Sequence, residues 1–321
     1  MTLDPAAARV LAMLVGAEAR DASVTAEDRR LSLRQLAELA AGPADPAVAA
    51  EPYIYRRRGP RGPLALRRYR PVEEAEGPGG LIVYLHGGGW VAGDLDTHDR
   101  VCRALAAHSR CQLLAVHYRR PPEHPFPAPV EDAVEVLAWA RRQARRLGAD
   151  PRRIVLAGDS AGANLAAAAA GWFAARGRAA ARLIVLFCPI LEIAPTQPSR
   201  SEYGDGYFLD RRRMAEDVTA YLGDLTEADS PLASPLRIEH PADFPPTHLH
   251  LAEYDPFRDE GLAFAARLRA AGVPVCAEVH PGMIHYFYAL PRLIPYARAA
   301  LAKAGEAIAQ ALSNSSAGAE S

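Results

Sequence analysis

The sequence predicts an α/β fold in which helices cover both faces of a mostly parallel sheet. Short apolar runs typical of buried strands alternate with longer segments of helical composition along most of the 321 residues. Half of the residues are hydrophobic, which is enough for a sizeable core in one large domain or two smaller ones. The formal net charge is −1, so the charge balance does not favour nucleic acid or an anionic membrane as a partner.

Residues 4 to about 45 are predicted to form two helices. Thr25 and Asp28 have the spacing of a helix-capping pair, and Gly42 followed by Pro43 ends the unit. Two arginine-rich runs with alternating polarity then occupy 53–70 and meet at a turn of glycines and prolines. These runs predict an antiparallel pair of strands at one edge of the sheet.

A serine at the junction of a strand and a helix organises the centre of the chain. The apolar run 154–157 ends at Gly158, and an alanine-rich helical segment begins after Ser160. Residues 158–162 (GDSAG) fit the pattern G-x-S-x-G, in which Gly158 and Gly162 let strand and helix approach closely and leave the serine in an exposed turn. The positive end of the helix dipole favours negative charge on an oxygen bound there. An ordinary strand–helix turn that contains a serine by chance is the alternative.

A second glycine-rich turn, residues 86–90 (HGGGW), follows a predicted strand at 81–85. Three glycines after a strand let the backbone approach a ligand and offer unobstructed N–H donors. A phosphate or dinucleotide loop fits poorly, because the turn has neither G-x-G-x-x-G nor a lysine. Lys303 is the only lysine and lies in the C-terminal helical segment, which also disfavours Schiff-base and pyridoxal chemistry.

Two later strands lead to titratable residues. The run 247–253 leads to Asp255, and the run 273–279 is followed by a glycine-containing loop and His285. Ligands of open α/β sheets bind at the carboxyl ends of the strands. A serine hydroxyl becomes a good nucleophile when a neutral imidazole accepts its proton and a carboxylate orients that imidazole. The chain order Ser160, Asp255, His285 therefore predicts a hydrolytic site of this kind.

Other residues compete for two of these roles. Glu192 also follows a predicted strand, at 183–187, and Asp259 lies one turn beyond Asp255. Asp255 is preferred because it comes directly at a strand end. For the imidazole, His280 is the alternative to the histidine at 285, which is preferred because it follows the loop and does not end the strand.

The histidine and cysteine spacings predict no metal site. His248 and His250 share one face of a strand, but no third ligand is evident, so they are interpreted as structural. The four cysteines have no C-x-x-C spacing and are interpreted as reduced and buried. No metal and no organic cofactor are predicted. The N-terminus has no basic region before its apolar stretch, so a cytoplasmic location is expected.

Four motifs together resemble the hormone-sensitive-lipase family of bacterial carboxylesterases, also known as family IV. They are HGGGW at 86–90, GDSAG at 158–162, DPFRDE at 255–260 and GMIH at 282–285. The resemblance extends over nearly the whole chain. It implies an α/β-hydrolase fold with a mostly parallel eight-stranded sheet, flanking helices and a helical cap. It also implies hydrolysis of short- to medium-chain acyl esters through an acyl-enzyme intermediate.

The resemblance assigns a role to each residue of these motifs. The implied set is Ser160 as nucleophile, Asp255 as acid and His285 as base, Gly88, Gly89 and Ala161 as oxyanion donors, and His86 and Gly87 as their support. Trp90, Asp159, Tyr207 and Tyr286 are predicted to line the substrate pocket. Tyr286 stands where the family carries a glycine after the histidine, so a narrower pocket is expected.

The same resemblance divides the chain into segments. An N-terminal cap segment is expected at 1–45, a catalytic core at 46–190 and 230–313, an inserted cap segment at 191–229 and a disordered tail at 314–321. The expected partner is a small ester, and neither nucleic acid binding nor stable membrane insertion is expected. Whether the protein forms a homodimer is left open. Two other functions stay open: an acyltransferase or cyclising thioesterase with the same site, and a non-catalytic receptor like the plant gibberellin receptors, which lack the histidine base.

Overall fold

The computed structural model describes most of the chain, namely residues 2–15, 24–44, 46–57, 59, 61–72, 79–194 and 196–313. The predicted tail at 314–321 lies outside these residues. The strands are β1 (Val48–Tyr55), β2 (Leu64–Pro71), β3 (Gly79–Leu85), β4 (Gln112–Val116), β5 (Ala149–Asp159), β6 (Leu183–Phe187), β7 (Thr247–Tyr254) and β8 (Val275–Ile284). The α-helices are α1 (Pro5–Val15), α2 (Ala26–Ala41), α3 (Asp99–Ser109), α4 (Ala128–Gln143), α5 (Ala161–Ala174), α6 (Ser199–Glu202), α7 (Arg211–Leu222), α8 (Arg258–Ala270) and α9 (Tyr296–Ser313).

The strands form one eight-stranded sheet with the order β1-β2-β4-β3-β5-β6-β7-β8. Strand β2 pairs antiparallel with both β1 and β4, and the pairs from β4 through β8 are parallel. This confirms the predicted α/β fold with a mostly parallel sheet and an antiparallel edge. The carboxyl ends of β3, β5, β7 and β8 therefore lie along one edge of the sheet, and each leads directly into a predicted site motif.

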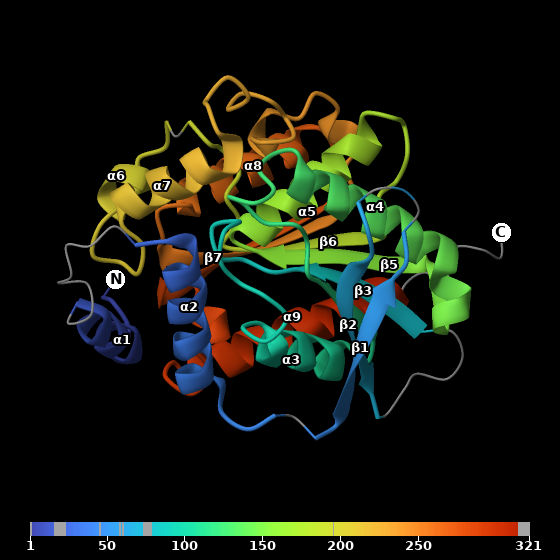
Figure 1. Ribbon diagram of the computed structural model, residues 1–321, viewed down its shortest axis with the longest axis horizontal. Coiled ribbons are helices and arrows are strands. Elements are labelled where there is room, and N and C mark those ends of the chain that lie inside the picture. The colour runs from blue at the N-terminus through green and yellow to red at the C-terminus, as the bar shows by residue number, and fades with distance from the viewer. Residues whose placement is uncertain are drawn as a thin grey trace.

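Helices cover both faces of the sheet, as Figure 1 shows: α4, α5 and α8 lie on one side and α3 and α9 on the other. Successive residues of β3 alternate between the two cores, with Val83 in the cluster under α4 and α5 and Ile82 in the cluster under α3 and α9. Alanines of α5 pack against the sheet with almost no exposed surface, because small side chains let this helix lie close to the strands. Helix α5 and the turn before it are thus held in place by the core.

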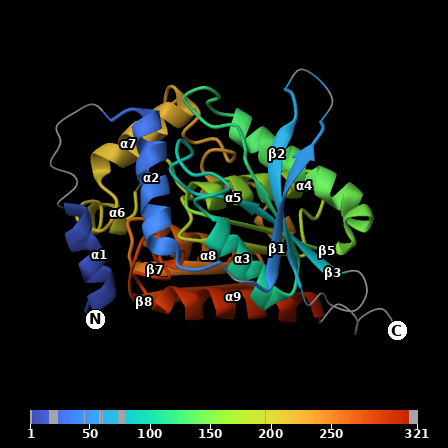
Figure 2. The same ribbon diagram turned by 60° about the horizontal axis from the view of Figure 1, so that its bottom comes forward.

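Helices α2 and α7 lie side by side at one end of the molecule, in both views (Figures 1 and 2). Arg29 of α2 forms an ion pair with Asp217 of α7, which joins the two segments that the sequence predicts to form the cap. The capping box predicted at the start of α2 is present, since Thr25 and Asp28 bond each other's backbone N–H. Within the described residues, no helix combines the length and apolarity needed to cross a bilayer.

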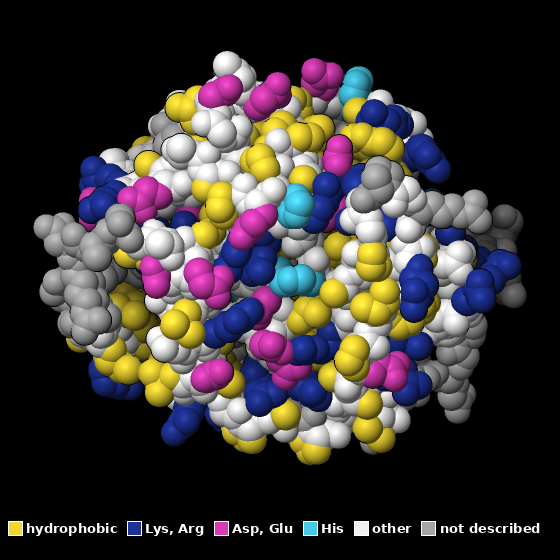
Figure 3. All heavy atoms as spheres, viewed as in Figure 1, with side chains coloured by type: hydrophobic (Ala, Val, Ile, Leu, Met, Phe, Trp, Pro, Cys, Tyr) yellow, Lys and Arg dark blue, Asp and Glu magenta, His cyan; other side chains and the backbone are white. Residues whose placement is uncertain are grey.

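Acidic and basic side chains are interspersed on the face of the molecule seen in Figure 3. The mixed charges on this face agree with the formal net charge of −1.

The predicted end of the last strand is wrong. The last strand was expected to end at residue 279, but β8 continues to Ile284, and its register with β7 shifts between Ala252 and Tyr254. The irregularity lets β8 resume pairing after Pro281 and Gly282, which the sequence pattern suggested would end the strand. His285 is therefore the first residue after the strand, and His280 lies inside it.

Candidate active site

Ser160 lies in a strained turn between β5 and α5. Its φ of +51° and ψ of −120° are unusual for a residue with a side chain. Both flanking glycines are required by packing: a Cβ at Gly158 would lie 2.5 Å from the carbonyl oxygen of Gly162, and a Cβ at Gly162 would overlap the carbonyl oxygen of Leu85. The turn therefore holds the side chain of Ser160 just beyond the carboxyl end of β5.

The structure brings Ser160, His285 and Asp255 together from three different strand ends. His285 Nε2 lies 3.0 Å from Ser160 Oγ, and His285 Nδ1 lies 2.8 Å from Asp255 Oδ2. The other carboxylate oxygen, Oδ1, accepts the backbone N–H of Phe257 at 2.8 Å. All three side chains are buried, Ser160 being 5% exposed. A hydroxyl, an imidazole and a carboxylate in this hydrogen-bonded order can pass the hydroxyl proton to the imidazole.

The competing residues lie elsewhere. His280 Nδ1 faces the Tyr296 hydroxyl at 3.0 Å, on the α9 side of the sheet. The Glu192 carboxylate accepts from Thr196. Asp259 accepts the backbone N–H of Ser199 at 3.0 Å. None of these three contacts involves Ser160 or His285.

The glycine turn after β3 approaches the same place. Gly88 and Gly89 have φ values of +113° and +59°, which favour glycine. A Cβ at Gly88 would lie 2.6 Å from the carbonyl carbon of Ala92. Ala161 is the first residue of α5, where a helix leaves N–H groups without a backbone acceptor. These residues can therefore present N–H donors beside Ser160.

Asp159 is a buried residue that binds the backbone of the glycine turn, and it does not line a pocket. It is fully buried, and its oxygens accept the Gly87 N–H at 2.9 Å and the Tyr84 and Tyr288 hydroxyls at 2.7 and 3.0 Å. Burial alone would raise the pKa of Asp159, but His98 and the hydrogen bonds outweigh it, so the pKa is lowered. A Cβ at Gly87 would overlap this carboxylate. We therefore correct the predicted pocket role of Asp159 to that of a buried anchor.

His86 packs beneath the glycine turn. Its ring stacks on Tyr118 with ring centres 4.3 Å apart, and the Tyr118 hydroxyl donates to the His86 carbonyl at 2.8 Å. Its Nδ1 lies 3.0 Å from the Gly87 carbonyl oxygen. Burial lowers the pKa of His86 to about 3, so the ring is neutral near pH 7 and suits the predicted supporting position.

Two aromatic side chains that the sequence analysis did not predict pack against Trp90 and Tyr286. Trp90 stacks face to face on Tyr221 of α7, with ring centres 4.3 Å apart. Tyr286 stacks on Phe208 at 5.5 Å, and Phe208 lies 6.2 Å from the His285 ring. Phe208 and Tyr221 come from the segment 191–229. The composition of this segment did not indicate which residues its aromatic side chains would contact.

Tyr207 belongs to a cluster of tyrosines at the carboxyl end of β7. Its ring packs against those of Tyr254 and Tyr203, with ring centres 5.6 and 5.2 Å away. The structure thus places Tyr207 in an aromatic cluster that joins the segment 191–229 to the sheet, whereas its neighbour Phe208 is the residue near His285.

A buried ion pair above the glycine turn was also missed. The Asp217 carboxylate occupies the space that a Cβ at Gly89 would need, and Arg29 is its partner. Burial raises the pKa of Asp217 to about 6, and the neighbouring Arg29 opposes this rise. No sequence pattern links two charges on helices so far apart in the chain.

One group of possible metal ligands lies outside the site. His250, Glu278 and His280 have ligand atoms within 4.8 Å of one another, a group that the sequence pattern did not predict and that does not include His248. However, His250 Nδ1 lies 3.2 Å from His280 Nε2 while the ring centres are 5.4 Å apart, so the two nitrogens face each other directly. That is the geometry of an N–H···N hydrogen bond, whereas two ligands of one ion point toward a third position. Glu278 pairs with Lys303 at 2.7 Å.

Comparisons with known proteins find a matching family model and several similar esterases. A family model described as "alpha/beta hydrolase fold" matches residues 82–289. The chain is 39% identical to Esterase LipI of Mycobacterium tuberculosis over 74% of this chain and 75% of that protein. It is 34% identical to the ethyl acetate hydrolase of Pseudomonas putida over 90% and 92%. Among solved structures, a thermostable esterase from Pseudomonas putida has a TM-score of 0.90 at 28% identity, covering 97% of this chain and 98% of that one. An ester hydrolase from the metagenome of Lake Arreo has a TM-score of 0.89 at 33% identity, covering 96% and 99%.

Proposed function

The chain belongs to the α/β-hydrolase family and is a carboxylesterase of the hormone-sensitive-lipase type, and from this premise we propose that Ser160, His285 and Asp255 carry its reaction. The observation that supports the assignment most strongly is the continuous series of contacts, 3.0 Å from Ser160 Oγ to His285 Nε2 and 2.8 Å from His285 Nδ1 to Asp255 Oδ2. Both distances are those of hydrogen bonds ready for proton transfer.

The proposed reaction has two halves. His285 Nε2 takes the proton of Ser160 Oγ as that oxygen attacks the ester carbonyl, and a tetrahedral intermediate forms. The imidazolium then gives this proton to the leaving alcohol, and an acyl-enzyme remains. In the second half His285 takes a proton from water, the hydroxide attacks the acyl carbonyl, and return of the proton to Ser160 releases the acid. Asp255 holds the ring in the required tautomer in both halves.

Negative charge on the carbonyl oxygen needs donors that are already in place. We assign this role to the N–H groups of Gly88, Gly89 and Ala161, with His86 and Gly87 holding the turn. Gly87 is itself held by Asp159, which accepts its N–H at 2.9 Å. Donors of this kind are each worth roughly 3 kcal/mol of transition-state stabilisation.

The segments 1–45 and 191–229 are proposed to act as a cap over a core formed by 46–190 and 230–313. The low exposure of Ser160 and His285, 5% and 3%, supports a largely enclosed site, which an ester would reach by movement of part of the cap. The cytoplasmic location expected from the sequence remains a prediction that cell fractionation tests, and sedimentation decides the question of a homodimer, which the sequence leaves open.

Short acyl chains are expected to be the best substrates. We attribute this preference to the stacked pairs Trp90–Tyr221 and Phe208–Tyr286, which would limit the room for a long acyl chain. In a series of p-nitrophenyl esters we expect kcat/KM for acetate to butyrate to exceed that for decanoate and longer chains by about tenfold or more. A maximum at long chains would contradict the proposed pocket, and no hydrolysis of any ester would contradict the proposed function.

Replacing Gly88 with alanine should disable the donors of the glycine turn. The new Cβ would meet the Ala92 carbonyl at 2.6 Å, and φ at this position is +113°, so the turn must shift. We expect kcat to fall about a hundredfold, the usual effect of losing one such donor. Gly272→Ala is the matched control, because Gly272 also has a positive φ, +82°, but open space around it. Equal kcat values for the two variants would argue against the assigned role.

A further inference from the structure

Glu260 is a fully buried carboxylate that connects the predicted core to the start of the predicted cap segment 191–229. It lies in the first turn of α8, shortly after Asp255, and is 1% exposed. Its Oε2 accepts the backbone N–H groups of Leu191 and Glu192 at 2.7 and 2.6 Å, where the chain leaves the core. Burial raises the pKa of Glu260 to about 7, and Arg200 opposes this rise.

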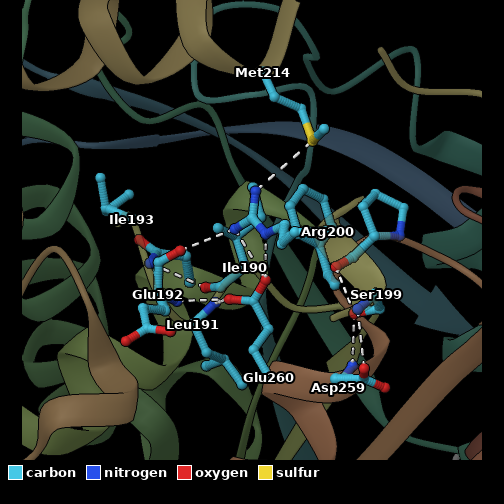
Figure 4. A network of polar contacts seen from close by, with 12 residues as sticks. Ile190, Leu191, Glu192, Ile193, Ser199, Arg200, Met214, Asp259 and Glu260 are labelled. Atoms are coloured by element: carbon cyan, nitrogen blue, oxygen red, sulfur yellow. Dashed lines mark hydrogen bonds and ion pairs between the residues drawn. The ribbon is translucent and has the colours of Figure 1, made fainter. Parts of the chain in front are cut away.

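Arg200 of α6 is the charged partner of Glu260, as Figure 4 shows. Its Nε and Nη2 lie 3.0 and 2.9 Å from Glu260 Oε1, and Nη2 also donates to the Glu192 carbonyl at 2.8 Å. Met214 of α7 contacts the same guanidinium through its sulfur at 3.7 Å. Arg200 therefore holds both helices of the segment 191–229 to the core.

The guanidinium also lies over the ring of Phe257, 4.3 Å from the ring centre. Phe257 makes two contacts with the reacting groups. Its ring packs perpendicular to the His285 ring at 5.1 Å, and its N–H donates to Asp255 Oδ1 at 2.8 Å. Among the described residues, Arg200 makes no hydrogen bond, ion pair or ring contact with Ser160, His285 or Asp255, and Phe257 is a side chain that touches both Arg200 and His285.

We propose that Arg200 is a positioning residue, which fixes the Phe257 ring against His285 and so couples the placement of the cap to the alignment of the base. This inference rests on the proposed function. The imidazole ring of His285 can rotate about the bond that joins it to Cβ. A small displacement of Nε2 from its position near Ser160 Oγ therefore slows proton transfer strongly. If the cap moved away from the core, Arg200 would lose its contact with the Phe257 ring. That ring would then no longer restrain His285. The fully aligned site then forms only when the cap is closed.

The test uses Arg200→Lys, which keeps a positive charge beside Glu260 but loses the flat group over Phe257. We expect kcat for a small ester such as phenyl acetate to fall about tenfold while KM changes less than about twofold. Arg267→Lys is the matched control: Arg267 lies on the same helix as Glu260 and bonds the Ile238 carbonyl. We expect its kcat to stay at the wild-type value. A kcat for Arg200→Lys equal to that of Arg267→Lys would overturn the proposal.

A double-mutant cycle tests whether the effect passes through Phe257. Phe257→Leu removes the ring and keeps the N–H that binds Asp255. If Arg200 acts through this ring, adding Arg200→Lys to Phe257→Leu lowers kcat no further. If the two losses multiply, Arg200 acts by another route and the proposal is wrong.

Labelling of the wild-type protein by a fluorophosphonate separates this inference from the proposed function. If the wild type is not labelled at Ser160 and hydrolyses no ester, the proposed function fails. If it is labelled and active while Arg200→Lys has unchanged kcat, only the inference about Arg200 fails. Melting temperatures of all variants identify any loss of kcat that is due to unfolding.

Discussion

Ser160→Ala is expected to lower kcat for ester hydrolysis by a factor on the order of 10⁵ to 10⁶. The variant keeps the turn, the glycine donors and His285, but no oxygen remains 3.0 Å from Nε2 to attack the carbonyl. The remaining rate would come from binding and from the oxyanion donors alone. Initial rates with phenyl acetate measure the loss, and a fluorophosphonate should label the wild type and leave the variant unlabelled.

Ser109→Ala is a suitable control for this substitution. Ser109 is also buried, and its Oγ accepts the backbone N–H of Cys111 at the end of α3, away from the strand ends that carry the site. We expect its kcat to stay within about twofold of the wild type. Turnover by Ser160→Ala at the rate of this control would end the proposed assignment.

Asp255→Asn is expected to lower kcat by a factor on the order of 10⁴. The new side chain has the same shape, and its oxygen can still accept the Phe257 N–H that now binds Oδ1. Its NH₂ group then faces His285 Nδ1, which must become an acceptor. The ring proton moves to Nε2, and Nε2 can no longer take the proton of Ser160.

Asp259→Asn makes the same chemical change four positions later. Asp259 accepts from Arg258 and from the Ser199 backbone and does not touch His285. We expect kcat to stay within about threefold of the wild type, with some loss of thermal stability. If Asp259→Asn lost as much activity as Asp255→Asn, the choice of Asp255 as the acid would be unsupported.

Local backbone requirements explain why much of the site could be predicted. Gly158 and Gly162 are needed because any Cβ there would collide with the backbone, and this requirement is visible as a five-residue pattern. The parallel order of the strands then places the residues that follow them at one edge of the sheet. For the same reason Asp255 and His285 were found by their positions after apolar runs.

The errors have a different physical origin. The family resemblance suggested a pocket role for Asp159, but its neighbours Tyr84, His98 and Tyr288 come from three other elements and bury it. The last strand was predicted to stop early because proline and glycine usually end strands, and an irregular pairing with β7 carries it on to Ile284.

The sequence by itself determined which turns carry the proposed reacting groups, since glycine spacing and strand ends depend on the local backbone. Only the tertiary structure decided which side chains surround and restrain those groups. The contacts of Phe208 with Tyr286, of Asp217 with the space above Gly89, and of Arg200 with Phe257 each join segments far apart in the chain. Such contacts depend on how the helices of 191–229 pack over the sheet, and packing of this kind has no periodic or compositional signal in the sequence.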